Sequence, residues 1–267
     1  MQKRLEKQLQ TKWMGKKLFY REQTESTITW SKEAAKNGCK KELDGAVFLA
    51  EAQTRGKGRI GRVWNSPPRE NIYMNLLLME PEIFPENAAS LTLVMGLSVA
   101  QAAIEVTGKS AGIKWPNDVV MSGKKICGIL TEMQVSGTMP KYITIGVGIN
   151  VNQREFPEEL QDKATSLRLE KGEILEREEM AAKTLEYFEK NYEKFLQTQD
   201  LSFLKSEYEA MLLNQNQPVR LIEKGIESRG IARGITGKGE LLVELETGEV
   251  KKVLSGEVSV RGLYSYV

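Results

Sequence analysis

The sequence predicts an α+β body over residues 1–215, a mixed β-sheet with packed helices, followed by a small β-barrel over residues 216–267. Two observations separate the parts. Apolar residues in the first part switch between strand-like and helical spacing, whereas short strand-like segments recur about every ten residues after Gln217-Pro218. The length of 267 residues fits this division, since one domain takes roughly 150 residues.

The elements of the body follow from local patterns. Residues 71–80 alternate and then become continuously apolar, which is typical of a strand in a covered sheet. Residues 88–106 have helical spacing and are closed by Gly108, while 25–27 favour a turn or a helix cap. The full expectation is strands at 17–22, 43–51, 71–80, 112–121 (broken at Trp115-Pro116), 124–133 and 142–152, and helices at 88–106, 176–197 and 201–213.

The second part consists of short strands separated by glycine turns. Its segments read VRLIEK, SRGIARGIT, GELLVELETG and VKKVLSGEVSVRG, and each is long enough for one strand of a small barrel.

Composition excludes several classes of function. The chain has no His, so a Ser-His-Asp triad and a His-based zinc site are impossible. Its 38 Lys+Arg and 36 Asp+Glu leave a net charge of +2, which gives no general reason to bind nucleic acid or a membrane surface.

The cysteines and the apolar segments predict a cytoplasmic protein. Cys39 and Cys127 have neither CxxC nor metal-knuckle spacing and are expected as unpaired thiols in a reducing compartment. Residues 1–17 lack the apolar core of a signal peptide, and 91–106 fall short of the ~20 apolar residues of a membrane span.

The strongest chemical signal is a basic glycine loop. Residues 55–62 hold four cations and three glycines with no acid among them. Glycines let successive backbone N–H groups turn inward around an anion, and arginines add planar donor forks. The spacing fits neither a Walker loop nor a GxGxxG turn. By itself the loop is compatible with a solvated turn, with nucleic-acid contact or with a phosphorylated small ligand.

Further motifs accompany this loop in a fixed order. They are EST (25–27), QTRGKGRIGRVW (53–64), KWPND (114–118), GKKICGILTE (123–132), IGVGIN (145–150) and SGEVSVR (255–261). Together they closely resemble biotin–protein ligases, over residues 17–262. The resemblance implies the class II synthetase-like fold of biotin ligases for the body and an SH3-like barrel at the C-terminus.

The resemblance also implies an activity. Such an enzyme joins biotin to ATP, giving biotinyl-5′-AMP and pyrophosphate, and then transfers biotin to a lysine of a biotin carboxyl carrier protein. The biotin carboxylate is already ionised, so its attack on the α-phosphate requires cations and amides rather than a general base. Mg²⁺ is expected with ATP, because the triphosphate charge needs neutralising.

The resemblance implies the residues that bind biotin. Lys125 and Arg59 are the expected catalytic residues; Lys125 would lie between the biotin carboxylate and the α-phosphate, with Lys124 on the opposite strand face as its control. Ser26, Thr27 and Gln53 are expected at the ureido ring, although the first two also suit a helix cap. The full biotin set is Ser26, Thr27, Gln53, Lys57, Gly58, Arg59, Trp64, Lys125, Gly128 and Gly146, in which Trp64 is either a pocket wall or core.

A second set is implied for ATP. It comprises Gly56, Arg59, Arg62, Lys114, Asn117, Asn150 and Arg261, with Asn117 and Asn150 also expected toward the Mg²⁺ of ATP. Arg62 would reach the pyrophosphate or anchor the loop, and Arg261 would reach ATP or lie on the surface. Asp118 would assist the site or cap a turn.

Two positions depart from the family pattern. Ile28 stands where Asn usually follows Ser-Thr, which removes an amide beside the ureido ring. Lys57 stands where Arg is usual, which keeps the charge but loses the bidentate fork.

Two alternatives remain open at this point. A lipoate or octanoyl acyltransferase would share the scaffold, and a regulator or nucleic-acid binder would use the loop alone. Residues 1–16 are too few for the helix-turn-helix of repressor relatives and resemble the linker after one, so no DNA partner is expected from this chain. A homodimer through sheet edges is plausible from the resemblance.

Overall fold

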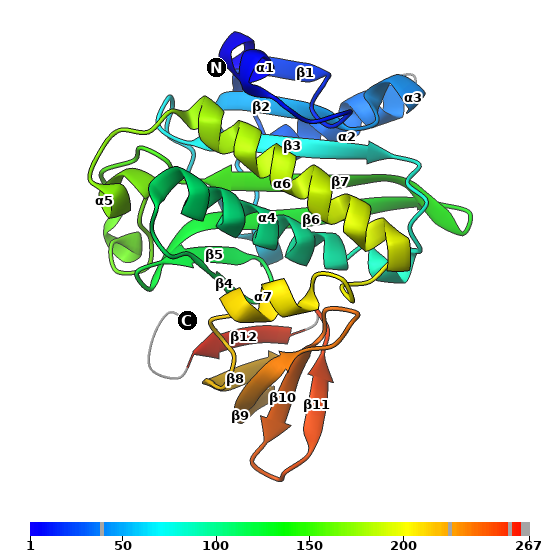
Figure 1. The fold of residues 1–267 in the computed structure, drawn as a ribbon, viewed down its shortest axis with the longest axis vertical. Helices are drawn as coiled ribbons and strands as arrows, with labels where there is room; N and C mark the ends of the chain where they lie inside the picture. Colours follow the sequence, from blue (N-terminus) through cyan, green and yellow to red (C-terminus); the bar gives the residue numbers. More distant parts are fainter. Residues whose placement is uncertain (38–39, 224–225, 256–257, 263–267) are drawn as a thin grey trace.

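The fold is a mixed sheet covered by helices, with a small β-structure attached at one end (Figure 1). It was obtained as a computed structural model that describes residues 1–37, 40–223, 226–255 and 258–262. The predicted division at residue 215 falls between the last helix of the body and the first strand of the barrel.

The body is built on a seven-stranded sheet in the order β1-β2-β3-β7-β6-β5-β4. Its β1 and β2 are parallel, and the other neighbours are antiparallel. The central β3 is buried along its whole length, as the apolar run at 71–80 predicts. The strands are β1 (Leu18–Thr24), β2 (Ala46–Gln53), β3 (Ile72–Met79), β4 (Gly112–Lys114), β5 (Asp118–Met121), β6 (Lys124–Ser136) and β7 (Met139–Ile149).

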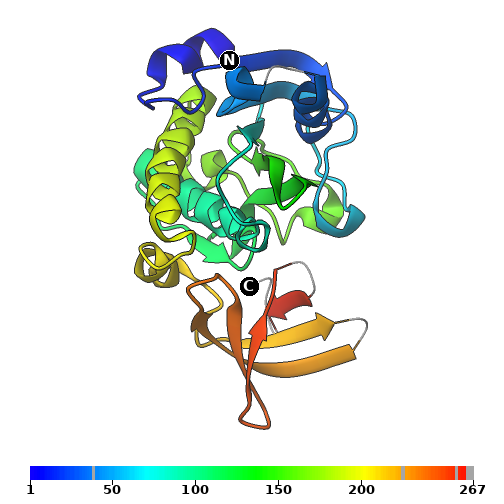
Figure 2. The same cartoon turned by 90° about the vertical axis from the view of Figure 1, so that its right-hand side faces the viewer.

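Helices cover both faces of this sheet. The long helices α4 and α6 lie across one face, and α2 lies on the other (Figure 2). The helices are α1 (Gln2–Gln8), α2 (Thr27–Asn37), α3 (Lys40–Leu43), α4 (Ser90–Thr107), α5 (Leu167–Lys171), α6 (Arg177–Thr198) and α7 (Lys205–Met211), with 3₁₀ turns at Arg59–Gly61, Pro85–Asn87 and Glu158–Leu160. Of these, α1, α2, α3 and α5 were not expected as helices from the sequence.

Helix α4 is a core helix. Residues Pro85–Thr107 are apolar and long enough to cross a membrane, but 78% of the relevant window is buried inside the protein. The helix packs between α6 and β6, so its hydropathy is explained by burial on all sides.

The N-terminal segment is part of the body, which corrects its interpretation as a linker. Leu5 and Met14 are fully buried. The backbone N–H groups of Lys12, Trp13 and Met14 donate to the Glu189 carboxylate on α6 at 2.7–3.1 Å. A buried carboxylate that accepts three backbone bonds anchors this segment more firmly than its polar composition suggests.

The segment 112–121 forms two strands rather than one broken strand. A cis peptide bond joins Trp115 to Pro116, and β4 and β5 pair as a hairpin on either side of it. The turn 115–118 therefore lies at the edge of the sheet. In the same region, Cys127 is a free thiol whose pKa is raised by complete burial, and Cys39 lies outside the described residues.

The C-terminal part is an antiparallel sheet in the order β11-β10-β9-β8-β12, which fits a small barrel. Its strands are β8 (Pro218–Glu223), β9 (Ile226–Ile235), β10 (Leu241–Leu245), β11 (Val250–Val253) and β12 (Val258–Gly262). Buried residues of the barrel, such as Val219 and Ile235, belong to the same apolar core as those of the body.

Candidate active site

The basic glycine loop folds as a short hairpin. Trp64 N donates to Gly56 O and Gly58 N donates to Arg62 O, so the two sides of the loop run antiparallel. At the tip, Ile60 (φ 56°) and Gly61 (φ 70°) are both left-handed, as in a type I′ turn. A β-branched residue is rarely found with a left-handed backbone, so the backbone of the turn is strained at Ile60. The Ile60 side chain is 75% exposed.

Within this hairpin, Arg59 reaches the sheet. Its Nη1 donates to Asn117 Oδ1 at 2.7 Å, and Asn117 Nδ2 in turn donates to Ile129 O on β6 at 3.2 Å. Burial lowers the pKa of the Arg59 guanidinium, and the nearby Asp118 carboxylate opposes that shift. Arg59 is thus a partly desolvated cation held at the β4–β5 turn.

Lys125 provides a second cation beside the same turn. Its Nζ lies 2.6 Å from Asp118 Oδ1, with the two side chains 23% and 15% exposed, and 5.2 Å from the centre of the Trp64 ring. The neighbouring Lys124 does not share this position: its exposed Nζ donates to Gln161 O rather than to Asp118. The consecutive residues Asn117 and Asp118 therefore each bind one of the two expected catalytic cations.

A polar group forms where β2 ends and α2 begins. Gln53 Oε1 accepts from the backbone N and the Oγ1 of Thr27 at 2.9 and 3.2 Å, and Gln53 Nε2 donates to Ser66 Oγ at 3.0 Å. Ser26 Oγ is buried and has no hydrogen-bond partner among the described residues. An unsatisfied buried hydroxyl favours a polar ligand at this point. Ser66 was missed from the sequence because it lies outside the recognisable motifs.

Two large side chains cover the glycines expected beside the ligand. Trp64 lies across Gly128 and Gly148, where an added Cβ would come within 2.8 and 2.5 Å of its ring. Ile28 lies against Gly146 in the same way, with Cδ1 2.6 Å from an added Cβ. Ile28 therefore occupies the space directly above Gly146, and the expected approach of biotin to this glycine stays a prediction.

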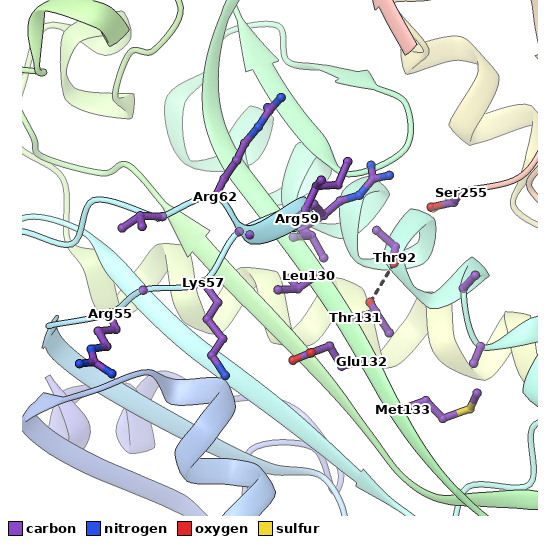
Figure 3. Close-up of a pocket in the computed structure, with 18 of the residues that line it drawn as sticks. Arg55, Lys57, Arg59, Arg62, Thr92, Leu130, Thr131, Glu132, Met133 and Ser255 are labelled. Atoms are coloured by element: carbon purple, nitrogen blue, oxygen red, sulfur yellow. Dashed lines mark hydrogen bonds between the residues drawn. The ribbon is translucent and has the colours of Figure 1, made fainter. Parts of the chain in front are cut away.

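A cavity of about 850 Å³ opens beside the hairpin. In Figure 3, Arg59 points toward Ser255 of the barrel, whereas Lys57 extends away from Arg59. Thr92 on α4 donates to Thr131 on β6 at 2.8 Å across this cavity. Thr92, Thr131, Glu132 and Ser255 all line it and were not singled out from the sequence, because none carries a chemistry that distinguishes it from a surface residue.

The remaining expected residues have varied positions. Gly56, Lys57, Gly58 and Arg62 all line the cavity, and Gly56 is itself buried, since an added Cβ there would meet Trp64 O at 2.4 Å. Lys114 is buried on β4 directly before the turn. The backbone of Arg261 pairs with Arg220, and its side chain lies outside the described part of the structure.

Asn150 is held beside Lys125 by its amide nitrogen, and its expected position toward ATP and Mg²⁺ stays a prediction. It is 5% exposed, and its Nδ2 donates to Thr165 O at 3.1 Å and Lys125 O at 3.5 Å. Asn117 is likewise engaged with Arg59. The described residues contain no group of three or more Cys, Asp or Glu that could hold a metal ion.

Comparison with known proteins identifies the class. Residues 20–150 match the Biotin/lipoate A/B protein ligase family, and residues 216–261 match the Biotin protein ligase C terminal domain. The fold and the site thus define a member of the biotin and lipoate ligase class.

Individual relatives narrow this class. The Bacillus subtilis (strain 168) protein named Bifunctional ligase/repressor BirA is 36% identical over 94% of this chain and 76% of its own length. The Mycobacterium tuberculosis protein named Biotin--[acetyl-CoA-carboxylase] ligase is 33% identical over 81% of this chain and 79% of its own. The solved biotin protein ligase from Aquifex aeolicus in complex with biotin and ATP superposes with a TM-score of 0.81 at 35% identity, covering 92% of this chain and 99% of that one. The chain belongs to the biotin protein ligases.

Proposed function

We propose that this chain activates biotin with ATP to form biotinyl-5′-AMP and pyrophosphate, and then transfers the biotinyl group to a lysine of a biotin carboxyl carrier protein. The observation that carries the proposal is that Arg59 and Lys125 bind the adjacent residues Asn117 and Asp118 of one turn, while Thr27 and Gln53 form a polar group where β2 ends and α2 begins. Two cations held in this way offset the repulsion between a carboxylate and a phosphate.

In the first step, the biotin carboxylate attacks the α-phosphate of ATP and pyrophosphate leaves. Ser26, Thr27 and Gln53 would hold the ureido ring, while Lys125 and Arg59 would hold the two reacting anions. Lys57, Gly58 and Arg62 would close over the adenylate from the hairpin. In the second step, the lysine amine of the carrier attacks the mixed anhydride and AMP leaves.

Magnesium would enter as the counterion of the triphosphate. Asn117 Oδ1 already accepts from Arg59, and Asn150 Nδ2 donates to Thr165 O; we assign no step to a protein-bound metal. A cytoplasmic location, the absence of a DNA partner and a homodimer through a sheet edge stay predictions. The outer strands of this sheet are β1 and β4, of which β4 is already bridged to Leu212 through Ile113.

The test of this proposal is a substrate comparison. The chain is incubated with α-labelled ATP, Mg²⁺ and either biotin or lipoate, and a purified biotin carboxyl carrier domain is added afterwards. We expect an adenylate with biotin and labelling of the carrier lysine by biotin. Activity with lipoate alone would indicate the acyltransferase alternative, which the match of residues 216–261 to a biotin ligase domain disfavours.

A further inference from the structure

Trp115 connects the barrel to the active site. It is the largest fully buried side chain of the body, and its indole Nε1 donates to Gly239 O at 3.0 Å in the turn between β9 and β10. Its backbone N donates to the buried Asn214 Oδ1 at 2.8 Å in the segment that leads from α7 to the barrel. Trp115 is thus fixed by the barrel and by the connecting segment.

The turn that receives Trp115 fits tightly on the body. Ser90 Oγ at the start of α4 donates to Lys238 O at 3.0 Å, and Leu201 N donates to Gly237 O at 2.7 Å. Gly239 has φ +80°, and an added Cβ would lie 2.9 Å from Leu93 Cδ2. The position of this turn is therefore set by close packing and hydrogen bonds together.

The turn 115–118 begins at Trp115 and ends at Asn117 and Asp118, which bind the two expected catalytic cations. Asn117 accepts from Arg59 and Asp118 binds Lys125, as described above. Only Pro116 separates Trp115 from this pair. A displacement of Trp115 would therefore move both cation partners, and positional errors of about 1 Å can cost on the order of 100-fold in rate.

We propose that the barrel holds Arg59 and Lys125 in their reactive positions through Trp115, which makes Trp115 a positioning residue for adenylate formation. The inference rests on the function proposed above. It gives the barrel a part in the first chemical step, even though the Trp115–Gly239 contact does not touch the substrate. The group proposed to hold biotin lies on other elements, since Gln53 ends β2 and Thr27 begins α2 directly after Ser26.

Two glycines of the barrel provide a matched test. Gly239 and Gly248 (φ +84°) both occupy left-handed turn positions, and the N–H of each donates to a carbonyl three residues earlier. They differ in their surroundings, since nothing lies within 4 Å of a Cβ added at Gly248. The backbone strain of Gly239→Ala and Gly248→Ala is therefore similar, but only Gly239→Ala pushes the turn away from the body.

The measured quantities are kcat for biotinyl-AMP formation, the KM for ATP, and the Kd for biotin without ATP. We expect Gly239→Ala to lower kcat about 10- to 100-fold, with the biotin Kd changed by less than about twofold. Gly248→Ala should keep the parent kcat. Equal kcat for the two variants would overturn the inference, as would a biotin Kd that weakens in proportion to kcat.

Trp115→Phe covers the case in which Gly239→Ala does not fold. It keeps a buried ring but loses the donor to Gly239 O, so we expect the same fall in kcat with a retained biotin Kd. A folded Trp115→Phe with parent kcat contradicts the inference alone. A parent protein that forms no adenylate contradicts the proposed function, and the inference fails with it.

Discussion

Lys125 Nζ lies 2.6 Å from Asp118 Oδ1, and this ion pair joins the neighbouring strands β6 and β5 at the open edge of the active site. A half-buried pair is less screened by solvent than one at the surface. The ion pair holds the Lys125 ammonium group in one place. An ammonium group has three N–H donors, so donors remain for a ligand. A bound anion can therefore be recognised by Lys125 while Asp118 keeps it oriented.

Replacement of Lys125 tests its catalytic role. We expect Lys125→Ala to lower the rate of adenylate formation by about 10²–10³-fold, because it removes a preorganised cation from the reacting phosphate. Lys124→Ala is the control, since Lys124 Nζ contacts Gln161 O away from the site. The assay follows α-labelled ATP, with circular dichroism to verify folding. Similar rates for both variants would remove Lys125 from its assigned role.

Arg59 is expected to retain the reactive intermediate. Arg59→Gly breaks the bond to Asn117 and frees the hairpin, so biotinyl-AMP should escape into solution and label lysines of unrelated proteins. Arg55→Gly is the matched control, because it also removes a cation from the same loop but acts on a side chain that is 79% exposed. The measurement is biotin label on bystander albumin. Retention of the adenylate by Arg59→Gly would contradict a clamping role.

Ile28→Asn tests the departure from the family pattern. Ile28 is 3% exposed against Gly146, so an amide there would be buried without an assured partner and should cost about 1–3 kcal/mol in the absence of ligand. We expect biotin to supply the missing partner, which gives the variant a lower melting temperature alone and a larger upward shift with biotin. Equal biotin affinity in calorimetry would show that the amide does not matter.

The Glu189 anchor predicts a pH dependence of stability. Burial by itself would raise the pKa of Glu189, but three backbone N–H bonds outweigh it and lower the pKa. A pKa that is lower in the native state than in the unfolded state stabilises the fold at pH values above the unfolded pKa of about 4.3. This stabilisation is lost as the pH falls through the native pKa. Glu189→Gln should therefore be less stable than the parent at pH 7, with a difference that shrinks below about pH 4.

Urea unfolding at several pH values measures this difference. Glu193→Gln, one turn further along α6, is the control because the exposed Glu193 side chain pairs with the exposed Lys12 Nζ at 3.4 Å. A difference between Glu189→Gln and the parent that stays constant down to acid pH would contradict the anchor.

Local patterns were sufficient to predict most of the fold. The strands at β3, β6 and β7 and the long helices α4 and α6 lie close to their expected ranges, because each has many apolar residues at one clear spacing. Helix α1 was missed, since it is short and polar and is held by the buried Leu5 and by the bond from Gln8 to the distant Glu176. Tertiary contacts of this kind leave no local signal.

The site was predictable only in part for a similar reason. The motifs indicated Arg59 and Lys125, but not that consecutive residues of the 115–118 turn bind them. The contact between Ile28 and Gly146 and the strained Ile60 depend on how distant segments meet and on the hairpin that they form. Residue types suggest chemistry, whereas partners appear only when the chain is folded.

The most direct measurement is adenylate formation by the purified chain with α-labelled ATP, Mg²⁺ and biotin, with lipoate in parallel. The account predicts labelled biotinyl-5′-AMP with biotin, little product with lipoate, and transfer of biotin to an added carrier domain. An adenylate with lipoate but none with biotin, or no adenylate with either acid, would contradict it.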